Sequence, residues 1–364
     1  MMRHRVFGTS RRDFLTSVAG AGAGALFRAE PFFSQQKSST ASTASLRIDV
    51  HYHVVPPRLL QALGAQRLGG PSANWTPTHA LEAMDEAGVS TGISSIAPAG
   101  DPFSDRSTAV RLCRECNEYA ARLAADHPRR FGIFAAVPLP NIDASLREIE
   151  YAFDTLKSDG IALFTSYGDK WLGDPAFDAV FQELNRRNAI VYTHPNTASC
   201  CRSLLPNIGD GAIEWGTDTT RAIAQIIFGG AAARHPNVRI IFSHGGGTMP
   251  FLVERFTTMA RSAQFASKFP QGFGAAAANF FYDTAQVANP AAMSALSKVV
   301  PISQIVFGTD YPFRTAAEHV KGLKECGVFS SNELQAIDQN ALRLLRNSKL
   351  EFCPFLRKES LLSR

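Results

Sequence analysis

The sequence lacks the cysteine pattern of a disulfide-stabilised protein. Its 364 residues contain six cysteines, scattered along the chain. Cys113 and Cys116 form a CxxC pair in a segment of helical periodicity. Because no second pair follows, we interpret both as thiols that pack in a helix, not as a zinc or redox pair. Cys200 and Cys201 are adjacent, and since a disulfide between neighbours is strained, we expect two free thiols near a loop.

The chain also lacks the basic stripe with interleaved aromatic residues that is typical of nucleic-acid binding, so we expect no nucleic acid as a partner. The formal net charge is +5. Much of the excess lies near the two ends of the chain, at Arg3, Arg5, Arg11, Arg12, Arg357, Lys358 and Arg364. With 45% hydrophobic and 19% charged residues, the composition is that of a globular protein with ample material for one large core or two domains.

The N-terminal segment resembles a twin-arginine export signal. Residues 10–15 read SRRDFL and match the pattern Ser-Arg-Arg-x-Phe-Leu. The Gly/Ala-rich apolar stretch that follows is too short for a stable membrane anchor. The alternative is a basic N-terminal helix. We therefore predict export to the periplasm or the extracellular space, and a cytoplasmic location if the signal does not function. The predicted organisation is a signal and polar linker over 1–45, a folded domain over 46–350 and a tail over 351–364.

Eight short apolar or aromatic runs alternate with amphipathic stretches in the predicted domain. The runs occupy residues 46–50, 92–97, 131–137, 160–165, 189–193, 238–243, 279–284 and 304–309. The stretches between them end near Gly, Asn or Pro, as helices tend to. Eight strands alternating with helices over about 300 residues indicate a (β/α)8 TIM barrel. A doubly wound open sheet is the alternative, but no Gly-rich phosphate motif follows the first run.

The first run leads into IDVHYH at residues 48–53, which contains three candidate metal ligands. Side chains alternate along a strand, so Asp49, His51 and His53 share one face. Two imidazoles so placed can reach a single cation. Taken alone, the HxH pair could equally be two solvated residues at a strand end. The choice depends on whether further ligands occupy similar positions later in the chain.

Further candidate ligands do follow later strands. His194 in YTHPN, His244 in FSHGGG and Asp310 in FGTDYPF come after the fifth, sixth and eighth runs. A barrel brings the C-terminal ends of its strands to one rim, so we expect these residues to lie together. Histidines combined with an aspartate suit Zn²⁺ with one open position, and Mn²⁺ is also compatible with the carboxylate. His127 and His235 precede proline in helix-to-strand turns and are expected at the opposite rim.

The motifs DVHYH, YTHPN, FSHGGGTMPFLVERF and FGTDYPF, with IDQNALRLL closing the domain, resemble the amidohydrolase-related metal-dependent decarboxylases. That group includes the aminocarboxymuconate-semialdehyde and γ-resorcylate decarboxylases. The resemblance extends from about Leu46 to Leu345, and the stretch 166–201 is most similar to the 6-methylsalicylate decarboxylase branch. It implies loss of CO₂ from a small aromatic carboxylate such as 6-methylsalicylate, which would give 3-methylphenol.

The resemblance also implies roles for individual residues. One divalent ion, Zn²⁺ or alternatively Mn²⁺, would be held by His51, His53, His194 and Asp310. His244 would be catalytic, and either His244 or Asp310 would deliver the catalytic proton. Arg255 would bind the substrate carboxylate, and since in relatives this arginine can come from a neighbouring subunit, we expect a homodimer or higher homo-oligomer.

Two departures from relatives refine these expectations. A second substrate arginine, in the loop after the first strand of the muconate-semialdehyde enzyme, has no clear counterpart in this chain, where Arg67 is merely nearby; this favours a monocarboxylate substrate. The fourth run ends in LFTSYGDK without a lysine at the strand end itself, which favours one metal ion over two. A lactonase-like hydrolase that uses the same metal to activate water, and an exported binding protein without catalysis, remain the alternative functions.

Overall fold

The computed structural model describes residues 46–98, 103, 105 and 107–346. The predicted signal and linker (1–45) and the predicted tail (351–364) lie outside these described residues.

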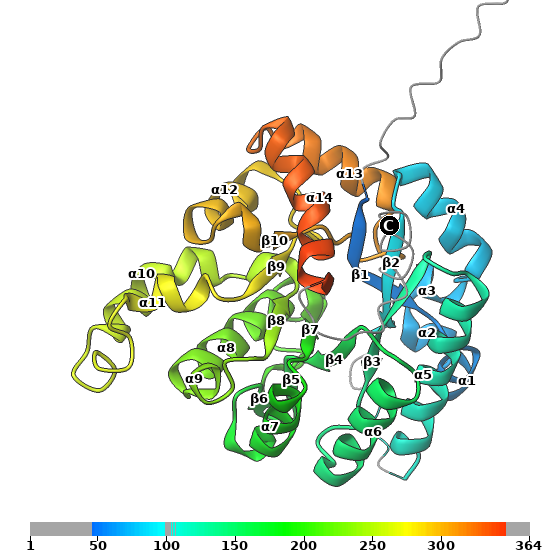
Figure 1. The fold of residues 1–364 in the computed structure, drawn as a ribbon, viewed down its shortest axis with the longest axis horizontal. Coiled ribbons are helices and arrows are strands. Elements are labelled where there is room, and N and C mark those ends of the chain that lie inside the picture. The colour runs from blue at the N-terminus through cyan, green and yellow to red at the C-terminus, as the bar shows by residue number, and fades with distance from the viewer. Residues whose placement is uncertain (1–45, 99–102, 104, 106, 347–364) are drawn as a thin grey trace, which may run out of the picture. The chain divides into compact units, whose positions relative to one another are not determined.

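Eight parallel strands form a single sheet whose spatial order is their order along the chain, β1-β2-β3-β4-β7-β8-β9-β10. The sheet nearly closes on itself, because Val50 N donates to Phe307 O (3.0 Å) and His53 N donates to Tyr311 O (2.8 Å) across the seam. Helices surround the strands in a ring (Figure 1). The predicted (β/α)8 barrel is confirmed. The strands are β1 (Ile48–Val54), β2 (Thr91–Ile96), β3 (Phe131–Ala136), β4 (Gly160–Phe164), β7 (Ile190–His194), β8 (Arg239–Phe242), β9 (Phe281–Asp283) and β10 (Ile305–Val306).

The helices follow the predicted alternation, with additional short elements in the loops. Thr76 and Asn141 begin two of them by accepting hydrogen bonds from backbone N–H groups of the first turn, as N-cap residues do. A two-stranded hairpin, β5 (Ser166–Tyr167) with β6 (Lys170–Trp171), follows β4. The helices are α1 (Pro57–Leu63), α2 (Ala65–Leu68), α3 (Gly70–Ala73), α4 (Pro77–Ala87), α5 (Ala109–Asp126), α6 (Ile142–Asp154), α7 (Asp178–Arg186), α8 (Glu214–Phe228), α9 (Ala231–Arg234), α10 (Met249–Ala260), α11 (Gly272–Ala277), α12 (Pro290–Val299), α13 (Ala316–Glu325) and α14 (Ser331–Arg346).

Apolar side chains fill the barrel near the beginnings of its strands. Ile48, Ile93 and Ile190 belong to this inner core, and Leu344 and Leu345 of α14 pack against it. Figure 1 shows α14, in orange to red, beside the barrel strands. With this end filled by apolar residues, the opposite, C-terminal strand ends are left for polar chemistry.

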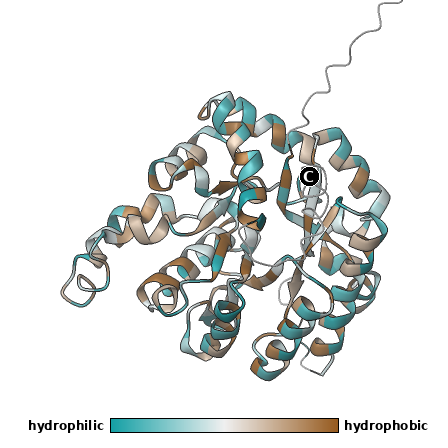
Figure 2. Cartoon of the chain, viewed as in Figure 1, coloured by the Kyte–Doolittle hydropathy of each residue, from teal (hydrophilic) through white to brown (hydrophobic). Residues whose placement is uncertain are grey.

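The outer helices carry both hydrophobic and hydrophilic residues along their length, as expected for helices that pack one face on a barrel (Figure 2). Among the described residues, no helix has the length and apolar character needed to cross a membrane. The pair α10 and α11 extends outward from the barrel (Figure 1). On α10, Phe251 is 68% exposed and Met259 is 38% exposed, so this arm presents apolar side chains to its surroundings.

Candidate metal centre and active site

β1 carries the two histidines of the HxH motif within the strand, not after its end as the sequence suggested. The Nε2 atoms of His51 and His53 lie 3.1 Å apart, and both side chains are fully buried. His51 Nδ1 donates to the Asp283 carboxylate (2.8 Å). Because an ionised carboxylate only accepts, Nδ1 carries a proton, and in the neutral ring the lone pair is therefore on His51 Nε2. Two ring nitrogens facing each other at this distance require a shared proton or a cation between them.

His194 ends β7, and its tautomer follows from one contact. Its Nδ1 donates to the carbonyl oxygen of Pro195 (2.9 Å), and since a carbonyl only accepts, Nε2 again carries a lone pair. This Nε2 atom is buried and has no hydrogen-bond partner among the described residues. A buried nitrogen left unpaired is costly unless something else binds it. His194 therefore offers a free ligand atom.

His244 follows β8 in a left-handed backbone conformation (φ 53°). The carboxylate of Asp283 accepts a hydrogen bond from its backbone N–H (2.8 Å), so one buried aspartate contacts both His51 and His244. The His244 Nε2 atom is buried and lacks a hydrogen-bond partner in the described part of the chain. The nearest carboxylate oxygen, Asp310 Oδ2, is 3.5 Å away.

Asp310 lies after β10, also with positive φ (69°). Its Oδ1 is 3.1 Å from Nε2 of both His51 and His53. Its Oδ2 accepts a hydrogen bond from Gln286 Nε2 (3.0 Å). The carboxylate is thus oriented toward the histidines by a side chain that the sequence did not single out.

These residues form one cluster at the C-terminal ends of the strands. One ligand atom from each of His51, His194, His244 and Asp310 lies within 4.8 Å of the others, and all four side chains are buried. The contacts of His53 with His51 and Asp310 join it to the same group. Unpaired imidazole lone pairs beside a carboxylate are the donor set of Zn²⁺ and related divalent ions. The residues present therefore fit a divalent metal.

The electrostatics of the cluster favour a cation. Burial opposes charge on His51, but the carboxylates of Asp283 and Asp310 outweigh it and raise the His51 pKa to about 10. Burial lowers the pKa of His53. Burial, together with the neighbouring His53 and His51, holds the pKa of His194 well below its usual range. For Asp310, burial acts in the opposite direction, but the charge of His51 and the close contacts with the site histidines keep its pKa far below normal.

It follows that, in the metal-free protein, a proton on His51 offsets part of the negative charge of Asp283 and Asp310. A divalent ion would displace that proton, so metal binding should release protons.

Asp283 is a site residue that sequence reasoning missed. It ends β9 and stands in the run FFYDT, so an acidic residue at a strand end was the available signal. By contrast, Asp49 of the IDVHYH motif does not join the cluster. Its carboxylate accepts from Thr309 Oγ1 (2.6 Å) and Thr309 N (3.1 Å), which ties β1 to the segment after β10.

A cavity of about 360 Å³ opens beside the cluster. Trp215 and Phe313 contribute aromatic rings to it, and their ring centres lie 5.7 Å from His194 and 5.9 Å from His53, respectively. Such a mixture of aromatic walls and a few converging polar groups suits a small, flat ligand. The cavity is lined by Gly211, Trp215, Gly216, His244, Gln286, Asp310 and Phe313.

Arg255, predicted to bind substrate, is not among the residues that line this cavity. It lies on α10 with an exposed side chain. Within the described residues, no ion pair involves Arg255. The single chain thus gathers His51, His53, His194, His244 and Asp310 but leaves Arg255 on the outward-extending arm.

The sequence matches the amidohydrolase family over residues 48–346. It is 37% identical over 284 residues to the decarboxylase yanB of Aspergillus niger, covering 73% of this chain and 77% of that protein. It is 33% identical over 328 residues to the 6-methylsalicylic acid decarboxylase of Aspergillus aculeatus, covering 84% and 97%. A structure of 5-carboxyvanillate decarboxylase from Novosphingobium aromaticivorans, complexed with manganese and 4-hydroxy-3-methoxy-5-nitrobenzoic acid, superposes with a TM-score of 0.71 at 18% identity, covering 83% and 96%. The chain belongs to the amidohydrolase family, in its group of decarboxylases.

Proposed function

We propose that this protein is a metal-dependent, non-oxidative decarboxylase of a small aromatic carboxylic acid. The proposed substrate is a salicylate such as 6-methylsalicylate, with 3-methylphenol and CO₂ as products. The observation that carries the proposal is the cluster of unpaired histidine nitrogens and a carboxylate beside a cavity with aromatic walls. The likeness to the Aspergillus aculeatus enzyme, over most of both chains, supports the choice of substrate.

One divalent ion per chain is proposed, with His51, His53, His194 and Asp310 as its ligands and His244 left for chemistry. Zn²⁺ is our first choice because imidazole nitrogens dominate the set. Mn²⁺ is the alternative, and the structural neighbour from Novosphingobium contains manganese. When bound, the ion would polarise the substrate carboxylate and the neighbouring hydroxyl as a Lewis acid.

The side chains of this protein would then supply position and a proton. Trp215 and Phe313 would hold the ring in the cavity, which limits its motion before reaction. A proton from His244 or Asp310 would move to the ring carbon that carries the carboxylate. The bond from that carbon to the carboxylate would then break, its electrons would restore the aromatic ring, and CO₂ would leave. Protonation comes first because direct loss of CO₂ would leave a poorly stabilised aryl anion.

Arg255 is proposed to bind the substrate carboxylate across a homodimer interface. Three properties of α10 support this: the exposure of Arg255, its lack of a partner in the described chain, and the exposed Phe251 and Met259 on the same helix. Apolar side chains exposed together are typical of protein interfaces. Equilibrium sedimentation would give the number of chains per particle, and a monomer that retained full activity would contradict the proposal.

Export through a twin-arginine pathway is proposed from the residues SRRDFL alone. A full-length chain expressed in a bacterium with this pathway should reach the periplasm. A variant with Arg11→Lys and Arg12→Lys should remain in the cytoplasm. Equal distribution of the two proteins between the fractions would refute the proposed signal.

The experiment that tests the proposed reaction compares metal-loaded protein with a small panel of salicylates and lactones. Release of CO₂ with formation of the corresponding phenol is the expected result. Ring opening of a lactone without CO₂ release would instead establish the hydrolase alternative. Metal-loaded protein that binds these compounds but converts none would indicate a binding protein.

A further inference from the structure

Cys200 and Cys201 form a pair of thiols in contact, separate from the candidate metal centre. Their Sγ atoms lie only 2.7 Å apart, and both are free thiols. A disulfide between neighbouring residues is strained, and strained or exposed disulfides are the ones that are readily reduced, so a bond formed here would be reversible. Cys200 is exposed and Cys201 is 8% exposed. One sulfur is thus accessible to a reagent and the other is held directly behind it.

The surrounding contacts hold this pair in place. Cys200 N donates to Asp169 Oδ1 (2.8 Å), and Ser199 N donates to the carbonyl of Gly168 (3.2 Å), so the turn is fixed to the β5–β6 hairpin. From α8, Arg221 Nη1 donates to Cys201 Sγ (3.6 Å). The hydrogen bond with Cys201 raises the pKa of Cys200 to about 11.

The CxxC pair in α5 provides a contrast within the same chain. Cys113 and Cys116 are both fully buried, and burial raises the pKa of Cys116 to about 12. Such thiols are inert toward dissolved reagents. Among the described cysteines, only the Cys200–Cys201 pair combines an exposed sulfur with a second sulfur in contact.

We propose that Cys200 and Cys201 form a reversible oxidation site that takes a small-molecule disulfide as its oxidant. In the first step the Cys200 thiolate attacks one sulfur of the reagent RSSR, which forms a mixed disulfide and releases one thiol. In the second step Cys201 attacks Cys200 Sγ, which closes the Cys200–Cys201 bond and releases the second thiol. The two cysteine protons end on the two RSH products, and the two electrons pass from the cysteines to the reagent.

The geometry assigns the order of these steps. Cys200 reacts first because it is the exposed sulfur, and Cys201 resolves the mixed disulfide because it is already in contact. Arg221 donates a hydrogen bond to the sulfur that is the nucleophile of the second step. Asp169, Arg221 and Cys201 are the titratable and charged groups that meet Cys200. Since the thiolate is the reactive form, the rate should rise about tenfold per pH unit from neutral pH toward the pKa of Cys200.

The test uses glutathione disulfide on the intact protein, followed by tryptic digestion and mass spectrometry. Trypsin releases residues 188–202, a peptide that contains Cys200 and Cys201 and no other cysteine. In the wild type this peptide should lose the mass of two hydrogen atoms, carry no glutathione, and return to the reduced mass with dithiothreitol. Cys201→Ser should retain a glutathione adduct at Cys200. Cys200→Ser should react at least about tenfold more slowly, because Cys201 is buried.

Three results would overturn the proposal: a stable glutathione adduct in the wild type, a pair that stays reduced while the unfolded chain oxidises, or a Cys200→Ser variant that reacts at the wild-type rate. Circular dichroism of each variant would verify the fold. Because the readout is a mass, the test does not depend on the proposed decarboxylase activity.

Discussion

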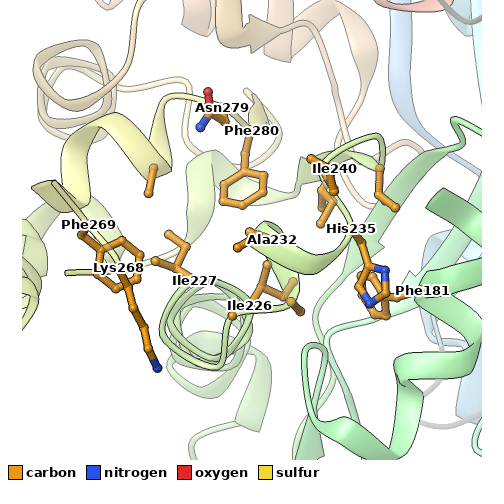
Figure 3. Close-up of a pocket in the computed structure, with 16 residues that line it drawn as sticks. Phe181, Ile226, Ile227, Ala232, His235, Ile240, Lys268, Phe269, Asn279 and Phe280 are labelled. Atoms are coloured by element: carbon orange, nitrogen blue, oxygen red, sulfur yellow. The ribbon is translucent and has the colours of Figure 1, made fainter. Parts of the chain in front are cut away.

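Two cavities in this protein differ in size and in chemistry, and the smaller one holds the candidate site. The larger, of about 630 Å³, lies among α8, α9 and β8 and is lined mainly by apolar residues such as Ile226, Ile240 and Phe280 (Figure 3). The smaller, of about 360 Å³, adjoins the metal centre. The larger cavity is therefore not the one beside the candidate site.

One histidine beside each cavity illustrates how the two cavities differ in their hydrogen bonding. His235 lines the larger cavity beside Phe181 (Figure 3), and its Nε2 is satisfied by Asp178 Oδ1 (2.9 Å). At the metal centre, His194 Nε2 is buried without a hydrogen-bond partner in the described chain. Buried polar atoms that converge without hydrogen-bond partners indicate a missing ligand. Buried polar atoms that have such partners indicate a structural role. Substitutions in the two regions should therefore differ in their effect on metal binding and activity.

Removing two proposed ligands should have the largest effect. A His51→Ala/His194→Ala variant should contain no stoichiometric metal and should lose activity by at least about a thousandfold, because several kcal/mol of metal-dependent stabilisation disappear. Elemental analysis and CO₂ release measure the two effects. His235→Ala is the matched control and should retain its metal. Full metal content in the double variant would remove the basis for the proposed site.

His244→Asn should separate catalysis from metal binding. If His244 moves a proton, the variant should keep its metal and fold but lose activity roughly 100-fold or more. Steady-state kinetics and elemental analysis on the same sample give both values. Stoichiometric loss of metal would show instead that His244 is a ligand. Full turnover with metal retained would make Asp310 the leading proton donor.

Asp283→Asn should weaken metal binding about 10- to 100-fold, because the carboxylate that orients a metal-binding histidine contributes to its affinity. Asp283 contacts both the His51 ring and the His244 backbone. Competition with a chelator measures the dissociation constant. Asp178→Asn is the matched control, since Asp178 bonds His235 in the other region. Equal affinity in the wild type and both variants would refute the role of Asp283.

Arg255→Ala should lower kcat/KM by about tenfold or more, because a lost charged contact costs about 2–5 kcal/mol. Arg261→Ala, at the end of the same helix, is the control and should behave as the wild type. If Arg255 acts on a neighbouring subunit, mixing Arg255→Ala with the metal-ligand variant should restore part of the activity. Unchanged kinetics in Arg255→Ala would show a surface role only.

The smallest effect is expected in the larger cavity. Lys268, exposed at its edge (Figure 3), can be changed to Met with a stability change within about 0.5 kcal/mol. Thermal unfolding and kcat/KM should both match the wild type. A marked change in kcat/KM would mean that this cavity also serves the reaction.

The pattern of residues along the chain predicted the barrel and the gathering of four histidines and Asp310 at one rim. Strand alternation places His51 and His53 on one face, and the closed parallel sheet brings His194, His244 and Asp310 to the same rim. Both rules depend on repeating patterns along the chain, so the faces and the rim can be predicted from the sequence. Strand boundaries were less accurate: β1 extends to Val54, past both histidines, while β10 covers only Ile305–Val306.

How those residues are held depends on contacts that form only in the folded chain. Asp283 sets the tautomer of His51 from 232 positions away, and Gln286 orients Asp310. Folding also brings the sulfur atoms of Cys200 and Cys201 into contact and leaves Arg255 on an outward-extending arm. The physical reason is that sequence periodicity determines which face a side chain occupies. Which atom carries the proton or the lone pair depends on a partner that reaches it only after the chain has folded.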